Sequence, residues 1–117
     1  MKKRIFIWLD DEREIPNKWL MRKTDEIEFK KFLNAEDLME WYGNHSYHYD
    51  RIFISFDHDL GRFLTGYDVA KFIVENNYNL TGFAVHSMNP VGCKNIIELL
   101  THYGYYQLKW GSEITTL

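Results

Sequence analysis

Short apolar runs alternate with amphipathic stretches along most of this chain. The runs at residues 4–9 (RIFIWL), 51–56 (RIFISF) and 81–87 (TGFAVHS) are largely apolar and rich in β-forming residues. Runs of this kind, rather than strict alternation, indicate strands covered on both faces. The run at 27–32 (IEFKKF) is more polar and alternates at first, so we expect it nearer an edge. Residues 105–110 (YYQLKW) are interpreted as a last strand.

Three amphipathic stretches predict helices, at residues 35–43, 65–77 and 91–104. Asn34 is a candidate N-cap of the first helix. Asn89 caps the third in the same way, and it is followed by a proline at the first helical position. Each stretch carries apolar residues at the spacing of one helical face, so each helix is expected to pack against the strands.

Strands and helices therefore alternate after the first two strands. This order predicts a parallel sheet with right-handed crossovers and helices on both faces. Residues 12–26 contain Pro16 and only a short amphipathic piece around residues 19–22, so the first helix is expected to be shortened or missing. The predicted fold is α/β, a three-layer doubly wound, mostly parallel five-stranded sheet in the flavodoxin-like order 2-1-3-4-5. We expect it to form one domain over residues 1–117.

Composition narrows the class of protein. The chain is 45% hydrophobic and 26% charged, as expected of a soluble globular domain, and its net charge of −3 gives no strong general affinity for nucleic acid. Cys93 is the single cysteine, so no intramolecular disulfide can form, and Cys93 alone cannot build a thiolate zinc site. The apolar stretches are too short for a signal peptide or a membrane span. We expect a cytoplasmic protein with no membrane partner.

Ionisable residues follow several of the predicted strands. They are Asp10, Asp11, Glu12 and Arg13 after the first strand, Asp57, His58 and Asp59 after the third, His86 with Ser87 at the end of the fourth, and Lys109 near the end of the fifth. In a doubly wound sheet these carboxyl ends share one edge, where ligands bind. The expected strand order makes the first and third strands neighbours, so their aspartates should lie close together.

Crowded carboxylates require compensation. Two of them about 4 Å apart repel by roughly 4 kcal/mol at an effective dielectric constant near 20. A proton or a cation must relieve this repulsion, and oxygen ligands suit Mg²⁺, Mn²⁺ or Ca²⁺, with nearby histidines favouring Mn²⁺ or another transition metal. The alternative is an ordinary one: an acidic pair after a strand often forms a solvated turn or a helix cap, and His86 could be a hydrogen-bonded interior histidine.

The layout resembles the receiver domain of response regulators. There an acidic pair after the first strand and an aspartate after the third bind Mg²⁺, and the latter accepts a phosphoryl group. Asp10, Asp11 and Asp57 match those positions, and Lys109 could match the receiver lysine. The sequence departs from signalling receivers at His58 and His86, which stand where such receivers usually carry no acid–base residue.

A closer resemblance is to the cyclic-phosphate processing receiver domain family. It rests on WLDDER (8–13), FDHDLG (56–61), TGYDVA (65–70) and HSMNPVG (86–92), which occur in the family's order over most of the chain. The resemblance implies a receiver-like domain with a metal-dependent activity on cyclic phosphates, with RNA ends or cyclic nucleotides as substrates. The partner would then be a small phosphorylated ligand or an RNA end.

These residues give a mechanistic hypothesis of metal-assisted phosphodiester hydrolysis. A divalent metal, Mg²⁺ or Mn²⁺, would be held by Asp10, Asp11 and Asp57, with Asp59 as a further ligand or partner. His58 or His86 would move a proton. Phosphate oxygens would be bound by Arg13, Ser87, Asn89 and Lys109.

Two alternatives remain at this point. Asp57 could be the phospho-acceptor of a signalling receiver, or the chain could bind a nucleotide or cyclic phosphate without catalysis.

Overall fold

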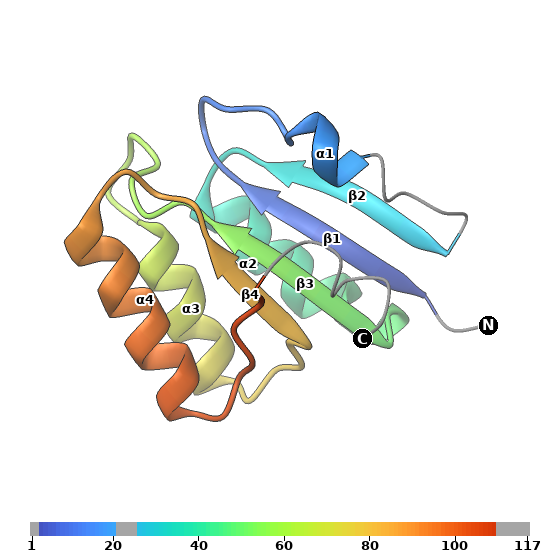
Figure 1. Cartoon of the computed structure of the whole chain (residues 1–117). Helices are drawn as coiled ribbons and strands as arrows, with labels where there is room; N and C mark the ends of the chain where they lie inside the picture. The colour runs from blue at the N-terminus through green and yellow to red at the C-terminus, as the bar shows by residue number, and fades with distance from the viewer. Residues whose placement is uncertain (1–2, 21–25, 110–117) are drawn as a thin grey trace.

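The computed structural model describes residues 3–20 and 26–109 as an α/β fold around a parallel sheet (Figure 1). The strands are β1 (Arg4–Leu9), β2 (Ile27–Phe32), β3 (Arg51–Phe56) and β4 (Gly82–Val85). They run parallel in the order β2-β1-β3-β4, which confirms the predicted order for the first four strands. In this order β1 and β3 are neighbours, and Leu9 lies opposite Phe56 where both strands end.

The helices follow the strands along the chain. They are α1 (Asn17–Leu20), α2 (Ala35–His45) with a 3₁₀ turn η1 (Ser46–His48), α3 (Gly66–Glu75) and α4 (Pro90–His102). The predicted caps are confirmed, because Asn34 accepts from the amide of Asp37 at 2.8 Å and Asn89 accepts from that of Gly92 at 3.0 Å. Side-chain acceptors of this kind satisfy amides that have no partner within the helix.

The three long helices pack on one face of the sheet. Alternate residues of β1 and β3, among them Ile7 and Ile54, join a buried core with residues from α2, α3 and α4. The other face carries a smaller cluster that includes Phe6 and Phe53. In Figure 1, α1 crosses in front of the sheet and α2 lies behind it. Among the described residues, the predicted third layer is thus reduced to α1 and the segment that brings Leu108 against the sheet.

The prediction of a fifth strand at residues 105–110 is wrong for the described part of that segment. Over residues 3–20 and 26–109 the sheet has four strands, and the segment makes one isolated parallel bridge, between Gln107 and Phe83. Tyr105 uses its amide to bond Leu100 at the end of α4, so it cannot extend the ladder. Trp110 lies outside the described residues.

The first helix is short, as the sequence predicted. Pro16 precedes α1, which has only four residues, and Trp19 stacks on Phe6 with ring centroids 4.8 Å apart. The rest of the predicted amphipathic piece, residues 21–22, lies outside the described part of the chain. None of the helices described here has both the length and the apolar character needed to cross a membrane.

Candidate functional site

A pocket opens at the carboxyl edge of the sheet, above the ends of β1 and β3. Its volume is about 560 Å³, and we call it the acidic pocket. It is lined by Asp10, Asp11, Glu12, Arg13, Asp57, Asp59, Gly61, Ser87 and Met88. The fold therefore brings six of the predicted site residues together: Asp10, Asp11, Arg13, Asp57, Asp59 and Ser87.

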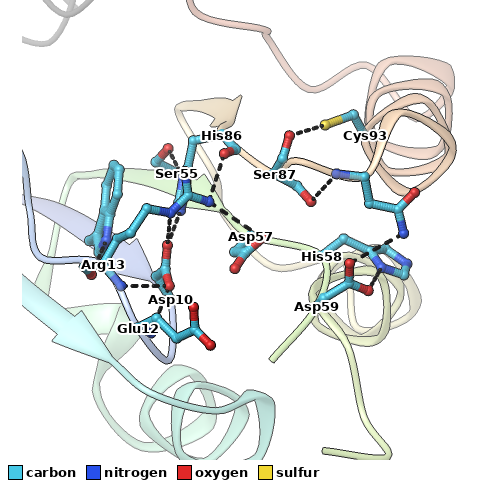
Figure 2. A network of polar contacts seen from close by, with 12 residues as sticks. Asp10, Glu12, Arg13, Ser55, Asp57, His58, Asp59, His86, Ser87 and Cys93 are labelled. Carbon is cyan, nitrogen blue, oxygen red and sulfur yellow. Dashed lines mark hydrogen bonds and ion pairs between the residues drawn. The ribbon is translucent and has the colours of Figure 1, made fainter. Parts of the chain in front are cut away.

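Asp10 is fully buried and accepts four hydrogen bonds (Figure 2). Its Oδ1 accepts from the amides of Glu12 at 2.8 Å and Arg13 at 3.0 Å. Its Oδ2 lies 3.1 Å from Arg13 Nε and 3.0 Å from His86 Nε2. Burial alone would raise the pKa of this carboxyl group, but these bonds bring the pKa below its usual value. Asp10 is therefore an ionised anchor that fixes the loop after β1.

Arg13 connects the groups of the pocket. Besides its bond to Asp10, its Nη2 donates to the backbone carbonyl of His86 at 3.0 Å. The same nitrogen lies 3.9 Å from Oδ1 of Asp57. The backbone of Arg13 is held as well, since its carbonyl accepts from the indole of Trp8 at 3.0 Å. One guanidinium group thus reaches residues that follow three different strands.

Of the two buried aspartates, Asp10 and Asp57, Asp57 has the negative charge that its surroundings stabilise less. It is buried, and burial and the negative charge of Asp10 raise its pKa above the usual value, although Ser87 and Arg13 oppose this shift. The backbone around it is tightly packed, because a Cβ at Gly66 would lie 2.0 Å from the carbonyl oxygen of Asp57. A glycine at the start of α3 is therefore required for this approach.

Asp11 faces the same pocket from the loop after β1. The turn after β3 approaches it closely, because a Cβ at Gly61 would lie 2.9 Å from Asp11 Oδ2. Gly61 also has a positive φ of 66°, a conformation that favours glycine. The FDHDLG turn thus needs its glycine for backbone conformation, whereas the contact with the Asp11 carboxylate could be relieved by a shift of that side chain.

His86 is held beneath Arg13. Its ring stacks on Trp8 with centroids 3.7 Å apart and an interplanar angle of 5°. Burial lowers its pKa to about 4, against the opposing effect of Asp10, so the ring is neutral at pH 7. Nε2–H then donates to Asp10, and Nδ1, 2.7 Å from Ser55 Oγ, accepts from that hydroxyl. Both ring nitrogens are engaged, and neither His86 nor His58 is among the residues that line the acidic pocket.

Sequence reasoning missed two members of this network, Ser55 and Trp8. Both lie on the sheet face opposite the long helices, where Trp8 is the register partner of Ser55. Ser55 is 2% exposed. The available signal was a hydroxyl in an otherwise apolar strand, since a buried polar group needs a partner.

His58 turns away from Asp57 and toward α4 (Figure 2). Its Nδ1 lies 2.9 Å from Oδ1 of Asp59, and its ring packs over Gly92, where a Cβ would come within 2.4 Å of Cγ. The bond to His58 lowers the pKa of Asp59, helped by Asn89, whose Nδ2 lies 3.4 Å from the other carboxylate oxygen. Of this pair, Asp59 lines the acidic pocket, and His58 lies behind it against α4.

The remaining predicted residues do not line the pocket, and one of them caps a helix. Asn89 caps α4, and its amide bonds Ser87 Oγ at 3.1 Å. Asp68 completes the capping box of α3 with Thr65. Lys109 is exposed, two residues after the bridge at Gln107, and is not among the residues that line the pocket.

One cluster in the described part of the chain has the spacing of a metal site. Asp10, Asp57 and His86 offer ligand atoms that all lie within 4.8 Å of one another. Two of these atoms, on Asp10 and His86, already share a hydrogen bond. Asp57 and Asp11 therefore have more freedom than Asp10 to bind a cation from the pocket.

Comparisons with known proteins identify the family and a similar fold. Residues 5–102 match the family described as Cyclic-phosphate processing Receiver domain. Among solved structures, the N-terminal domain of an uncharacterized protein from Wolinella succinogenes has a similar fold, with a TM-score of 0.63 and 18% identity. The similarity covers 99% of this chain and 89% of that one, whereas the comparison with curated proteins gives no significant match. Because the family match spans most of the sequence, the chain belongs to the cyclic-phosphate processing receiver domain family.

Proposed function

We propose that the protein is a metal-dependent phosphoesterase that opens cyclic phosphates, on RNA ends or cyclic nucleotides. The observation that carries this proposal is the acidic pocket, in which Asp10, Asp11 and Asp57 meet the guanidinium group of Arg13. Carboxylates can hold a divalent cation while an arginine binds phosphate oxygens. The family description adds the cyclic phosphate as the substrate class.

The donor set fits Mg²⁺ or Mn²⁺. Burial and the charge of Asp10 raise the pKa of Asp57, so a cation beside Asp57 would relieve an unfavourable charge. Asp11 and Asp57 would hold it, while Asp10, with four hydrogen bonds, would keep Arg13 and the loop in place. A metal bound there would polarise the phosphate and lower the pKa of a coordinated water.

Different residues would then contribute to different steps of ring opening. Water adds to phosphorus, one ring P–O bond breaks, and the leaving oxygen takes a proton, which gives a phosphomonoester. Arg13 would bind a non-bridging phosphate oxygen, and Ser87, which hydrogen-bonds Asp57, would keep that carboxylate in place. His58 is a better candidate than His86 for moving the proton, because both ring nitrogens of His86 are already engaged.

A specific observation supports a second candidate function. In the described pocket lining there is no histidine, and buried Asp57 faces the cavity with Ser87 beside it. This arrangement also suits a receiver in which Asp57 accepts a phosphoryl group. Incubation with a small phosphodonor, followed by mass measurement, would then give an acid-labile adduct on Asp57 and no turnover of cyclic phosphates.

The direct test is turnover of 2′,3′-cyclic nucleotides with Mg²⁺ or Mn²⁺, in wild type and in two matched variants. Asp57→Asn removes a carboxylate of the pocket, whereas Asp50→Asn makes the same change at an exposed position just before β3. We expect activity in wild type and Asp50→Asn and its loss in Asp57→Asn. Equal turnover in all three proteins would remove Asp57 from the site. Tight binding without product would favour a non-catalytic binding module.

A further inference from the structure

A second cavity lies next to the acidic pocket, on the sheet face opposite the long helices. Its volume is about 530 Å³, and we call it the aromatic groove. It is lined by Trp8, Arg13, Glu14, Pro16, Lys18, Trp19, Ser55, Ala84, Val85 and His86. Arg13 is the residue common to the two linings, so the groove and the acidic pocket meet at its side chain.

Among the described residues, only α1 and the segment around Leu108 pack on this face of the sheet, which leaves space for the groove. Trp19, from α1, stacks on Phe6 and stands partly exposed at the side of the groove. Trp8 and His86 stack on each other and are held by bonds to Arg13 and Ser55. The aromatic wall is therefore rigid, which favours binding of a flat ring with little loss of conformational freedom.

The lining has the chemistry of a site for an aromatic ligand that also carries negative charge. Partly exposed Trp19 and Pro16 supply apolar area, with buried Trp8 behind them, and the volume lies in the range of small-molecule sites. Lys18 and Arg13 add positive charge, whereas the one carboxylate of the lining, Glu14, is paired with Lys31 at 2.9 Å. A ligand whose phosphate meets Arg13 would direct its remaining part into this groove.

We propose that the aromatic groove binds the base of a nucleoside cyclic phosphate whose phosphate group lies in the acidic pocket. This inference rests on the proposed function and adds to it the site that binds the base of the substrate. Stacking of a base on an aromatic side chain is tolerant of base identity, so both purine and pyrimidine nucleotides are accepted.

Binding measurements with a matched pair of ligands test the groove separately from catalysis. The pair is adenosine 2′,3′-cyclic phosphate and 1-O-methyl-ribose 2,3-cyclic phosphate, which lacks the base. With Mg²⁺ present, calorimetry on the wild-type chain should give about tenfold tighter binding of the nucleotide. Tryptophan fluorescence should change with the nucleotide, because Trp8 and Trp19 line the groove.

Two variants locate the effect. Trp19→Leu should weaken nucleotide binding to the level of the base-free ligand and leave the base-free ligand unaffected. Tyr47→Leu removes an aromatic ring that is 75% exposed and lies outside the groove lining, so it should change neither affinity. Equal affinities of the two ligands for wild type, or no binding of either, would overturn the inference.

The outcome for the proposed function is read from product formation. Base-dependent binding without ring opening would support the groove and contradict the phosphoesterase. Equal binding and equal turnover of the two ligands would contradict the groove and leave the phosphoesterase standing.

Discussion

The half-buried histidine of the network, His86, gives a quantitative prediction of how stability depends on pH. Burial lowers the pKa of His86 to about 4 from its usual value of 6.5, and its side chain is only 14% exposed. Between these two values the unfolded chain binds the proton and the folded chain does not. Stability is therefore highest above pH 6.5 and falls as the pH is lowered toward 4.

The magnitude follows from the two pKa values. One pKa unit corresponds to about 1.4 kcal/mol, so complete protonation of His86 would remove about 3 kcal/mol of folding free energy. About 2 kcal/mol of this should be lost between pH 7 and pH 5. Asp57 acts in the opposite direction, because its pKa is raised in the folded state and its protonation favours folding at the acidic end.

Comparison of variants isolates the contribution of His86. The assay is urea unfolding at pH 7, 6 and 5, with wild type, His86→Gln and His102→Gln. His86→Gln should be less stable at pH 7 but should lose about 2 kcal/mol less than wild type on going to pH 5. His102→Gln, at an exposed position near the end of α4, should keep the wild-type dependence. The same pH dependence in His86→Gln as in wild type would refute a neutral, buried His86.

Three further predictions concern the rest of the site. Ser55→Ala should cost about 1–3 kcal/mol in urea unfolding, because it leaves His86 Nδ1 without its donor, and a loss below about 0.5 kcal/mol would contradict this role. Asp57→Asn should raise the melting temperature of the metal-free protein, because it removes a charge that burial and Asp10 make unfavourable. In wild type, Mg²⁺ at one hundred times its Kd should stabilise the fold by about 2.7 kcal/mol, and the variant should lose this stabilisation. An unchanged Mg²⁺ response would exclude Asp57 as a ligand. Gly66→Ala should destabilise the fold by about 1–3 kcal/mol, because the new Cβ would meet the Asp57 carbonyl. The control is Gly43→Ala, whose Cβ would have its nearest contact at 3.6 Å, so it should be neutral or stabilising. Equal effects of the two substitutions would contradict the close packing at Gly66.

Local signals were enough to predict most of the architecture. The apolar runs and the caps at Asn34 and Asn89 are short-range features, and the structure confirms the strands, helices and sheet order that they indicated. The described structure has a short first helix and lacks the predicted fifth strand, and in both places the local signals were weak or in conflict. These are the segment with Pro16 and the segment after Gly104, where bonding of Tyr105 to α4 decided the outcome.

The acidic pocket was predictable because parallel strands place their carboxyl ends on one edge. The strand register explains why Asp10 and Asp57 lie close together. The sequence could not show which of the two aspartates has the better stabilised negative charge. Hydrogen bonds from Arg13 and His86 make Asp10 a structural anchor, and the bond from His86 joins residues 76 positions apart.

The roles of the two histidines also depend on tertiary structure. His58 and His86 both follow strands, yet one packs over Gly92 beside Asp59 and the other is buried between Trp8 and Asp10. Sequence spacing alone treats them as equivalent, whereas burial and hydrogen bonding distinguish them.

The central claim is that the acidic pocket opens cyclic phosphates, and phosphorus NMR of one reaction mixture tests it most directly. Wild-type protein with Mg²⁺ or Mn²⁺ and adenosine 2′,3′-cyclic phosphate should convert the cyclic signal into that of a ring-opened monophosphate. The conversion should stop when the metal is chelated and should be absent with Asp57→Asn. A cyclic signal that remains unchanged with either metal, under conditions in which the ligand is shown to bind, would contradict the account.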